Sequence, residues 1–81
     1  MNQINCRIAA LWDADAKVWT ASSEDVPGLA TEADTLEALT EKLRILVPEL
    51  LRLNHVIQEN QASTVAIELT SHWQELIQVA A

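Results

Sequence analysis

The chain has little of what most catalytic and nucleotide-binding motifs require. Its 81 residues include one glycine and one cysteine, and no tyrosine or phenylalanine. A single glycine excludes the glycine-rich loops that hold phosphate groups, because those loops need several residues without a side chain. A single cysteine, Cys6, excludes an internal disulfide and therefore a disulfide-stabilised secreted mini-protein.

Basic residues are also scarce, since five Lys and Arg accompany twelve Asp and Glu, for a formal net charge of -7. Duplex binding depends on basic side chains that neutralise phosphates, so this balance argues against direct nucleic-acid binding, and an anionic membrane surface is disfavoured for the same reason. No apolar run approaches the roughly 20 residues that span a bilayer, and no secretory signal pattern opens the chain. We therefore expect a cytoplasmic protein without a membrane or nucleic-acid partner.

Hydrophobic residues nevertheless make up 49% of the chain, which is too many for a disordered acidic tail. A chain of this length is close to the size at which one hydrophobic core only just suffices for stability. We expect a single domain over residues 1–81 that gains further burial by self-association.

Period-two alternation of apolar and polar residues predicts four strands. They cover residues 3–12, 18–23, 29–33 and 65–70. A four-residue loop over residues 14–17 places Trp12 opposite Trp19 in a hairpin. Pro27 and Gly28 match the two central positions of a type II turn, and because proline cannot donate to a ladder the strand that follows is predicted at a sheet edge.

A leucine stripe predicts one main helix over residues 35–53. Its members recur at spacings of three and four: Leu36, Leu39, Leu43, Leu46, Leu50 and Leu53. Asp34 and Glu37 predict a capping box at the helix start, and Pro48 predicts a kink or a break. Apolar spacing after Ser71 predicts a short C-terminal helix. The β-β-β-α-β order predicts an α+β fold, with an antiparallel sheet and the main helix on one face.

Candidate catalytic and metal-binding residues are few, and each has a plainer structural interpretation. Asp13 and Asp15 form a carboxylate pair, but they lack the glycine and the distal glutamate of a calcium loop, and aspartate is common in turns. His55 and His72 have no cysteine at zinc-ligand spacing, and Cys6 lies in an apolar alternation that predicts a buried thiol. We expect no enzyme activity, no metal and no cofactor.

The helix carries more apolar residues than one sheet can cover. Ile45, Val47 and Leu51 lie off the leucine stripe, so the pattern predicts that they are exposed or covered by another segment. One interpretation is a homo-oligomer or partner interface at these residues, with a dimer as the first expectation, and Trp73 either joins this patch or covers it within the same chain. The other interpretation is that residues 54–63 fold over them.

Several short motifs follow one another in a fixed order. They are Trp12-Asp13, Val18-Trp19, residues 25–29 (DVPGL), residues 31–38 (TEADTLEA) and residues 43–51 (LRILVPELL). In this order they resemble the HicB-like family of small bacterial proteins, in a short branch known as a domain of unknown function. The resemblance covers residues 4–69, which is nearly the whole chain.

The resemblance implies a partly degraded ribonuclease-H-like fold without nuclease activity, and residues 3–11 contain no carboxylate for the metals of such a nuclease. HicB-like proteins are antitoxins that bind and mask HicA, a small basic RNA-cleaving toxin, and an acidic surface suits such a partner. Many HicB-like proteins also carry a C-terminal DNA-binding domain, for which residues 71–81 are too few, so we expect no separate DNA-binding domain.

Two functions therefore stay open. The resemblance implies a non-catalytic antitoxin-type module with a basic HicA-like toxin as its partner, or an orphan relative of such modules. The alternative is a small homodimeric structural or ligand-sensing module that is unrelated to toxin neutralisation.

Overall fold

The computed structural model describes residues 2–58 and 63–80. Within them lie four strands and one helix: β1 (Asn2–Asp13), β2 (Val18–Ser22), β3 (Thr31–Ala33), α1 (Leu36–Leu53) and β4 (Ser63–His72). The predicted β-β-β-α-β order and the α+β class are confirmed. Among the described residues, no helix is both long and apolar enough to cross a membrane.

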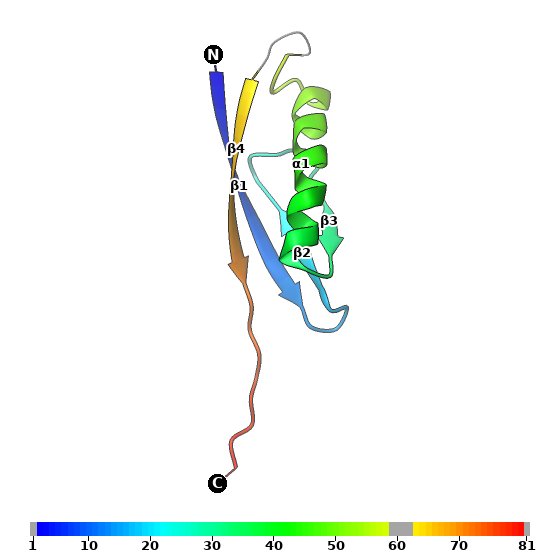
Figure 1. Ribbon diagram of the computed structural model, residues 1–81, viewed down its shortest axis with the longest axis vertical. Coiled ribbons are helices and arrows are strands. Elements are labelled where there is room, and N and C mark those ends of the chain that lie inside the picture. The colour runs from blue at the N-terminus through cyan, green and yellow to red at the C-terminus, as the bar shows by residue number, and fades with distance from the viewer. Residues whose placement is uncertain (1, 59–62, 81) are drawn as a thin grey trace.

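The strands form one sheet in the order β3-β2-β1-β4. β1 and β2 are antiparallel, and Trp12 lies opposite Trp19 with the ring centroids 5.3 Å apart, as the hairpin spacing predicts. β3 pairs antiparallel with β2 at the predicted edge position. β4 pairs parallel with β1, so the prediction of an all-antiparallel sheet is wrong. The reason is that α1 carries the chain back along the sheet, and β4 then starts at the same end as β1 (Figure 1).

The predicted C-terminal helix is absent from the described residues. Residues 73–80 continue beyond β4 as an extended segment that leaves the body of the molecule (Figure 1). We call residues 73–80 the C-terminal arm. The physical reason is that so short a helix is marginal in water unless it packs on something, and the arm does not return to the sheet.

One row of α1 side chains packs into the core between the helix and the sheet. Its members are Leu39, Leu43, Val47 and Leu51, each at most 1% exposed. Successive members are four residues apart, and a four-residue step advances about 40° beyond a full turn. The row therefore winds around the helix and follows the twist of the sheet, whereas the leucine stripe assumes a straight seam.

This row corrects the predicted interface. Val47 and Leu51 are buried within their own chain, so they do not form an exposed surface for a second copy. The segment after α1 turns back toward the core, since Ile57 is buried in the core cluster and the Val56 and Ile57 amides donate to the Leu51 carbonyl at 2.8 and 3.3 Å. Within the segment that follows α1, Ile57 is therefore the residue that returns to the core, and whether residues 54–63 cover the helix stays a prediction, because residues 59–62 lie outside the described residues.

The start of α1 differs by one residue from the prediction. The cap is Thr35, whose Oγ1 accepts a hydrogen bond from the Ala38 amide at 3.0 Å. Asp34 precedes the cap, and Glu37 lies in the first turn of the helix. Both Asp34 and Thr35 are good capping residues, so spacing alone does not distinguish them. Pro48 neither ends nor interrupts the helix, which continues to Leu53.

The turn before β3 has the predicted form. Gly28 has a φ of +80°, and the Leu29 amide donates to the Val26 carbonyl at 3.2 Å across Pro27 and Gly28. Val26 and Leu29 are both buried, so this turn directs two side chains into the core. The amide of the Asn54 side chain also donates to the Pro27 carbonyl at 3.3 Å, which ties the turn to the end of α1.

Candidate functional site

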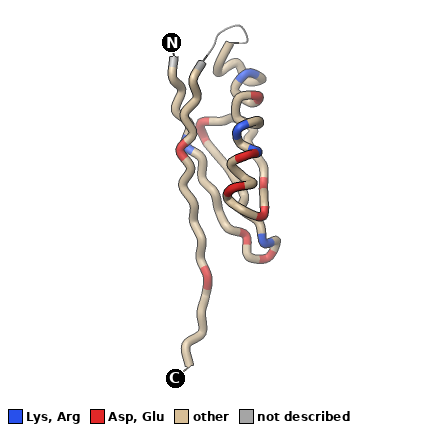
Figure 2. The backbone as a smooth tube through the Cα atoms, in the orientation of Figure 1, with Lys and Arg blue, Asp and Glu red and all other residues tan. Residues whose placement is uncertain are grey.

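Negative charge gathers at the end of the sheet where the β1–β2 hairpin, β3 and the start of α1 meet (Figure 1, Figure 2). Six exposed acidic residues lie on these segments: Asp13, Asp15, Glu32, Asp34, Glu37 and Glu41. We call these six residues the acidic end. Lys17 and Lys42 accompany them, and Lys42 Nζ donates to the Glu32 carbonyl at 2.6 Å. Half of the twelve acidic residues thus occupy one exposed region.

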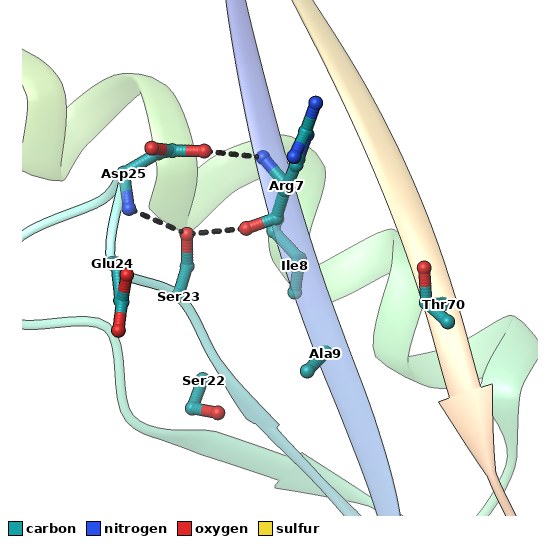
Figure 3. A pocket seen from close by; sticks show the side chains of 8 residues that line it. All are labelled: Arg7, Ile8, Ala9, Ser22, Ser23, Glu24, Asp25 and Thr70. Carbon is teal, nitrogen blue, oxygen red and sulfur yellow. Dashed lines mark hydrogen bonds between the residues drawn. The ribbon is translucent and has the colours of Figure 1, made fainter.

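An open pocket of about 540 Å³ lies on the face of the sheet opposite α1. It is lined by Arg7, Ile8, Ala9, Ser22, Ser23, Glu24, Asp25 and Thr70 (Figure 3). Ala9 pairs with both Ser22 and Thr70 and alternates with the buried Ile8 and Ala10, which places the pocket on the outer face.

Side chains of the loop after β2 form one wall of this pocket. Ser23 Oγ donates to the Arg7 carbonyl at 2.6 Å, and Asp25 Oδ2 accepts from the Arg7 amide at 2.8 Å. The Asp25 amide donates to Ser23 Oγ at 3.0 Å, which closes the network (Figure 3). These bonds satisfy the backbone groups of Arg7 where β2 no longer pairs with β1.

The chemistry of the pocket follows from these bonds. The Ser23 hydroxyl proton is committed to a backbone carbonyl, so the hydroxyl is not activated by a neighbouring base. Arg7 and Glu24 contribute the remaining charged groups, and the Arg7 side chain points away from the Ser23 loop (Figure 3). The pocket therefore has the groups to bind a small polar ligand, and Ser23 is not arranged for covalent catalysis.

Cys6 lies on the inner face of β1 next to Arg7 and is 1% exposed. Burial, and to a smaller extent the negative charge of Asp25, raise the pKa of the Cys6 thiol above its ordinary value. A thiol with a raised pKa stays protonated at neutral pH and is a poor nucleophile. The prediction of a buried thiol is confirmed.

The two aspartates of the hairpin have a structural role. Asp13 Oδ1 accepts hydrogen bonds from the Asp15 and Ala16 amides at 3.0 and 3.2 Å, which is the turn geometry that favours aspartate. His72 pairs with Leu11 and lies at the same end of the sheet as Asp13. In the described part of the chain, no three His, Cys, Asp or Glu side chains gather closely enough to hold a metal ion.

His55 also has a structural explanation. Its φ is +59°, and it follows Asn54, the residue that ends α1. The His55 amide donates to the Arg52 carbonyl at 3.1 Å, and the Val56 amide donates to the Leu51 carbonyl at 2.8 Å. This pair of bonds is a Schellman motif, in which glycine usually occupies the position of His55.

The exposed members of the predicted interface lie on separate elements. Ile45 is 65% exposed on α1, and Trp73 is 58% exposed at the start of the C-terminal arm. The arm also exposes Leu76, Ile77 and Val79, which the sequence pattern assigned to a short helix or left unassigned. The self-association of the chain stays a prediction.

The sequence patterns did not predict the pocket. Arg7 and the loop at Ser23 and Asp25 are 16 and 18 residues apart, and they meet only because the hairpin folds β2 back along β1. Asp25, which precedes the turn at Pro27, is the one local signal of the pocket wall, because its carboxylate offers an acceptor to a backbone amide.

Comparison with known proteins identifies a family but no activity. The family model described as a domain of unknown function (DUF1902) matches residues 5–79. The crystal structure of the hypothetical protein TTHA1013, from the extremely thermophilic bacterium Thermus thermophilus, is similar, with 46% identity and a TM-score of 0.74 over 90% of this chain and 99% of that chain. None of the curated proteins matches. The fold and the match over residues 5–79 together show that the chain belongs to the DUF1902 family.

Proposed function

We propose that the chain is a non-catalytic, antitoxin-type module that binds and masks a small basic RNA-cleaving protein of the HicA kind. The observation that carries this proposal is the acidic end, where six exposed carboxylates are accompanied by two lysines. The order of motifs that resembles HicB-like proteins supports the same kind of partner.

The masking would be electrostatic and would need no chemistry in this chain. A protein that cleaves RNA holds the phosphate backbone with basic side chains. Carboxylates of the acidic end would pair with those same side chains and so exclude the RNA. Complementary charge also speeds the encounter of the two proteins, and salt weakens this attraction.

The first test is whether the reading frame next to this one encodes a small basic protein, and the absence of such a protein would count against the proposal. RNA cleavage by that protein is measured with increasing amounts of the chain, at low and at high salt. We expect inhibition at a stoichiometric ratio, weakened by salt. The triple variant Asp15→Asn, Glu37→Gln and Glu41→Gln should lower the affinity at least about tenfold, since each charge contact at an interface is worth on the order of 1 kcal/mol or more.

Glu49→Gln, Glu68→Gln and Glu75→Gln together provide the matched control, because they neutralise three carboxylates that are exposed but lie outside the acidic end. This control should inhibit as the parent chain does. The proposal is wrong if the parent chain leaves the RNA cleavage unchanged, or if the two sets of variants lose affinity equally.

The pocket beside Arg7 favours a second candidate function, which is a ligand-sensing module. Its volume of about 540 Å³ suits a small metabolite, and Arg7 would supply the charge for an anionic group. A ligand that binds the folded state raises its melting temperature, so a panel of small carboxylates and phosphates would reveal it. The shift should be lost in Arg7→Gln, and the absence of any shift across the panel would contradict this second candidate.

A further inference from the structure

Among the described residues, the C-terminal arm is the one segment that does not pack against the protein's own core. Pairing between β4 and β1 ends where His72 lies opposite Leu11, and no backbone hydrogen bond joins residues 73–80 to the rest of the described chain. Leu76, Ile77 and Val79 are between 75% and 90% exposed. An extended segment with apolar side chains is not stable alone in water, so it needs a partner for its backbone and its side chains.

The sequence of the arm continues the alternation of β4. Val65, Ile67 and Leu69 pair with Ile4, Cys6 and Ile8, and they therefore point to the side of the sheet that carries α1. The same side is continued, two residues at a time, by Ser71, Trp73, Glu75, Ile77 and Val79. The opposite side is mostly polar. The family match runs to residue 79, so the arm belongs to the domain and is not an appended tail.

The outer edge of β4 offers a surface of the right kind. It is ten residues long and contains no lysine, arginine or proline, which are the residues that usually protect an edge from pairing. Ile67 on its inner face is 37% exposed, because α1 lies on the same face of the sheet but over β2 and β3, toward the opposite edge (Figure 1). Such an edge pairs readily with another strand.

We infer that β4 and the C-terminal arm pair antiparallel with the same segment of a second copy of this chain, around a two-fold axis at His72. Charge favours this surface, since two copies of net charge -7 repel, and residues 63–80 contain only two of the twelve acidic residues, Glu68 and Glu75. Symmetry limits the registers in which the two strands can pair. A two-fold axis perpendicular to a sheet pairs residues that point to the same face.

The register at His72 opposes Val65 with Val79 and Ile67 with Ile77. Each arm then lies wholly against residues 64–71 of the other copy. Glu68 and Glu75 point to opposite faces of the sheet and therefore cannot lie opposite each other. At the register centred on His72, no like charges are directly opposed. The result is one continuous sheet with both α1 helices on the same side. This pairing does not rest on the proposed function, because it uses none of the six residues of the acidic end and shares only Thr70 with the pocket.

A cysteine at the axis tests the register. Opposed residues of an antiparallel pair have Cα atoms about 4.5–5.5 Å apart, within the range of a disulfide. In a Cys6→Ala background, His72→Cys should therefore form a covalent dimer under mild oxidation. Thr70→Cys is the matched control, because the two copies of residue 70 would lie four residues apart along the strands and should stay monomeric in denaturing electrophoresis.

Sedimentation analysis tests the association itself. The parent chain should sediment as a dimer, and Ile77→Asp should shift it to a monomer with an unchanged helical circular dichroism spectrum, because the arm does not contact the core. Gln78→Asp adds the same charge on the other face of the arm and should leave the dimer intact. A monomeric parent chain, a dimer that survives Ile77→Asp, or efficient crosslinking at residue 70 in place of residue 72 would each overturn the inference.

Discussion

The two edges of the sheet are built in opposite ways. β3 is three residues long, lies under α1, and has the carbonyl of Glu32 occupied by Lys42. β4 is ten residues long, carries no basic residue or proline, and continues into an apolar arm. Proteins usually shorten or charge the edges that must not pair. The contrast indicates that the β3 edge is closed by its own chain, whereas the β4 edge is suited to a partner.

The largest expected effect concerns α1, which covers the β3 side. Leu43→Ala should lower the free energy of unfolding by about 2–5 kcal/mol, because it leaves a cavity at a side chain that is 1% exposed. Leu53→Ala is the matched control on the same helix, and at 73% exposure it should change stability by no more than about 0.5 kcal/mol. Denaturant unfolding measures both. Equal losses would mean that α1 packs differently from the row described above.

The turn at Gly28 precedes β3, the short edge strand. Gly28→Ala should cost about 1–2 kcal/mol, because alanine at positive φ is strained. The added Cβ would meet only Leu50 Cδ2, at 3.7 Å, so the cost should come from the backbone. In a Leu50→Ala background the cost of Gly28→Ala should therefore be the same, again by denaturant unfolding. A cost that disappears there would assign the effect to the side-chain contact.

The N-terminal cap of α1 follows directly after β3, the short edge strand. Thr35→Ala should cost about 1 kcal/mol, because the Ala38 amide loses its acceptor. Asp34→Ala should cost less than about half of that, since Asp34 precedes the cap. Thermal unfolding of the two variants ranks them directly. If Asp34→Ala proved the more destabilising, the predicted capping box would be right and the observed cap wrong.

The smallest effect concerns Cys6, which lies in β1 beside β4. The pKa of the Cys6 thiol is raised in the folded state, so folding favours the protonated thiol. The stability that this protonation contributes is fully present below the ordinary pKa of 9.0 and is lost as pH rises above it. The parent chain should therefore lose slightly more stability between pH 8 and about pH 10 than Cys6→Ala does. Denaturant midpoints measure this difference. Parallel pH profiles would show that the thiol titrates as it does in the unfolded chain.

Local patterns predicted the local features of this fold. The Trp12–Trp19 pair, the turn at Gly28 and the main helix each follow from a few neighbouring residues, and each is confirmed. Longer-range features did not follow. The parallel partner of β1, the buried positions of Val47 and Leu51 and the pocket beside Arg7 all depend on contacts between distant segments.

The C-terminal arm shows why one such error occurs. Its apolar residues fit both a helical spacing and an alternating one, so periodicity in so short a segment does not decide between them. Which period is realised depends on what the segment packs against. The alternation that runs from Val65 through Val79 becomes informative only once β4 is known to pair with β1.

By itself, the sequence determined the elements of this protein, its scarcity of basic charge and its unsuitability for phosphate loops or disulfides. These are properties of residue types and of neighbours along the chain. The tertiary structure decided which helix row is buried, which sheet edge is closed, where six carboxylates gather and where the arm projects. The physical reason is that burial and exposure of an apolar side chain depend on segments far away in the sequence, which only the folded chain brings together.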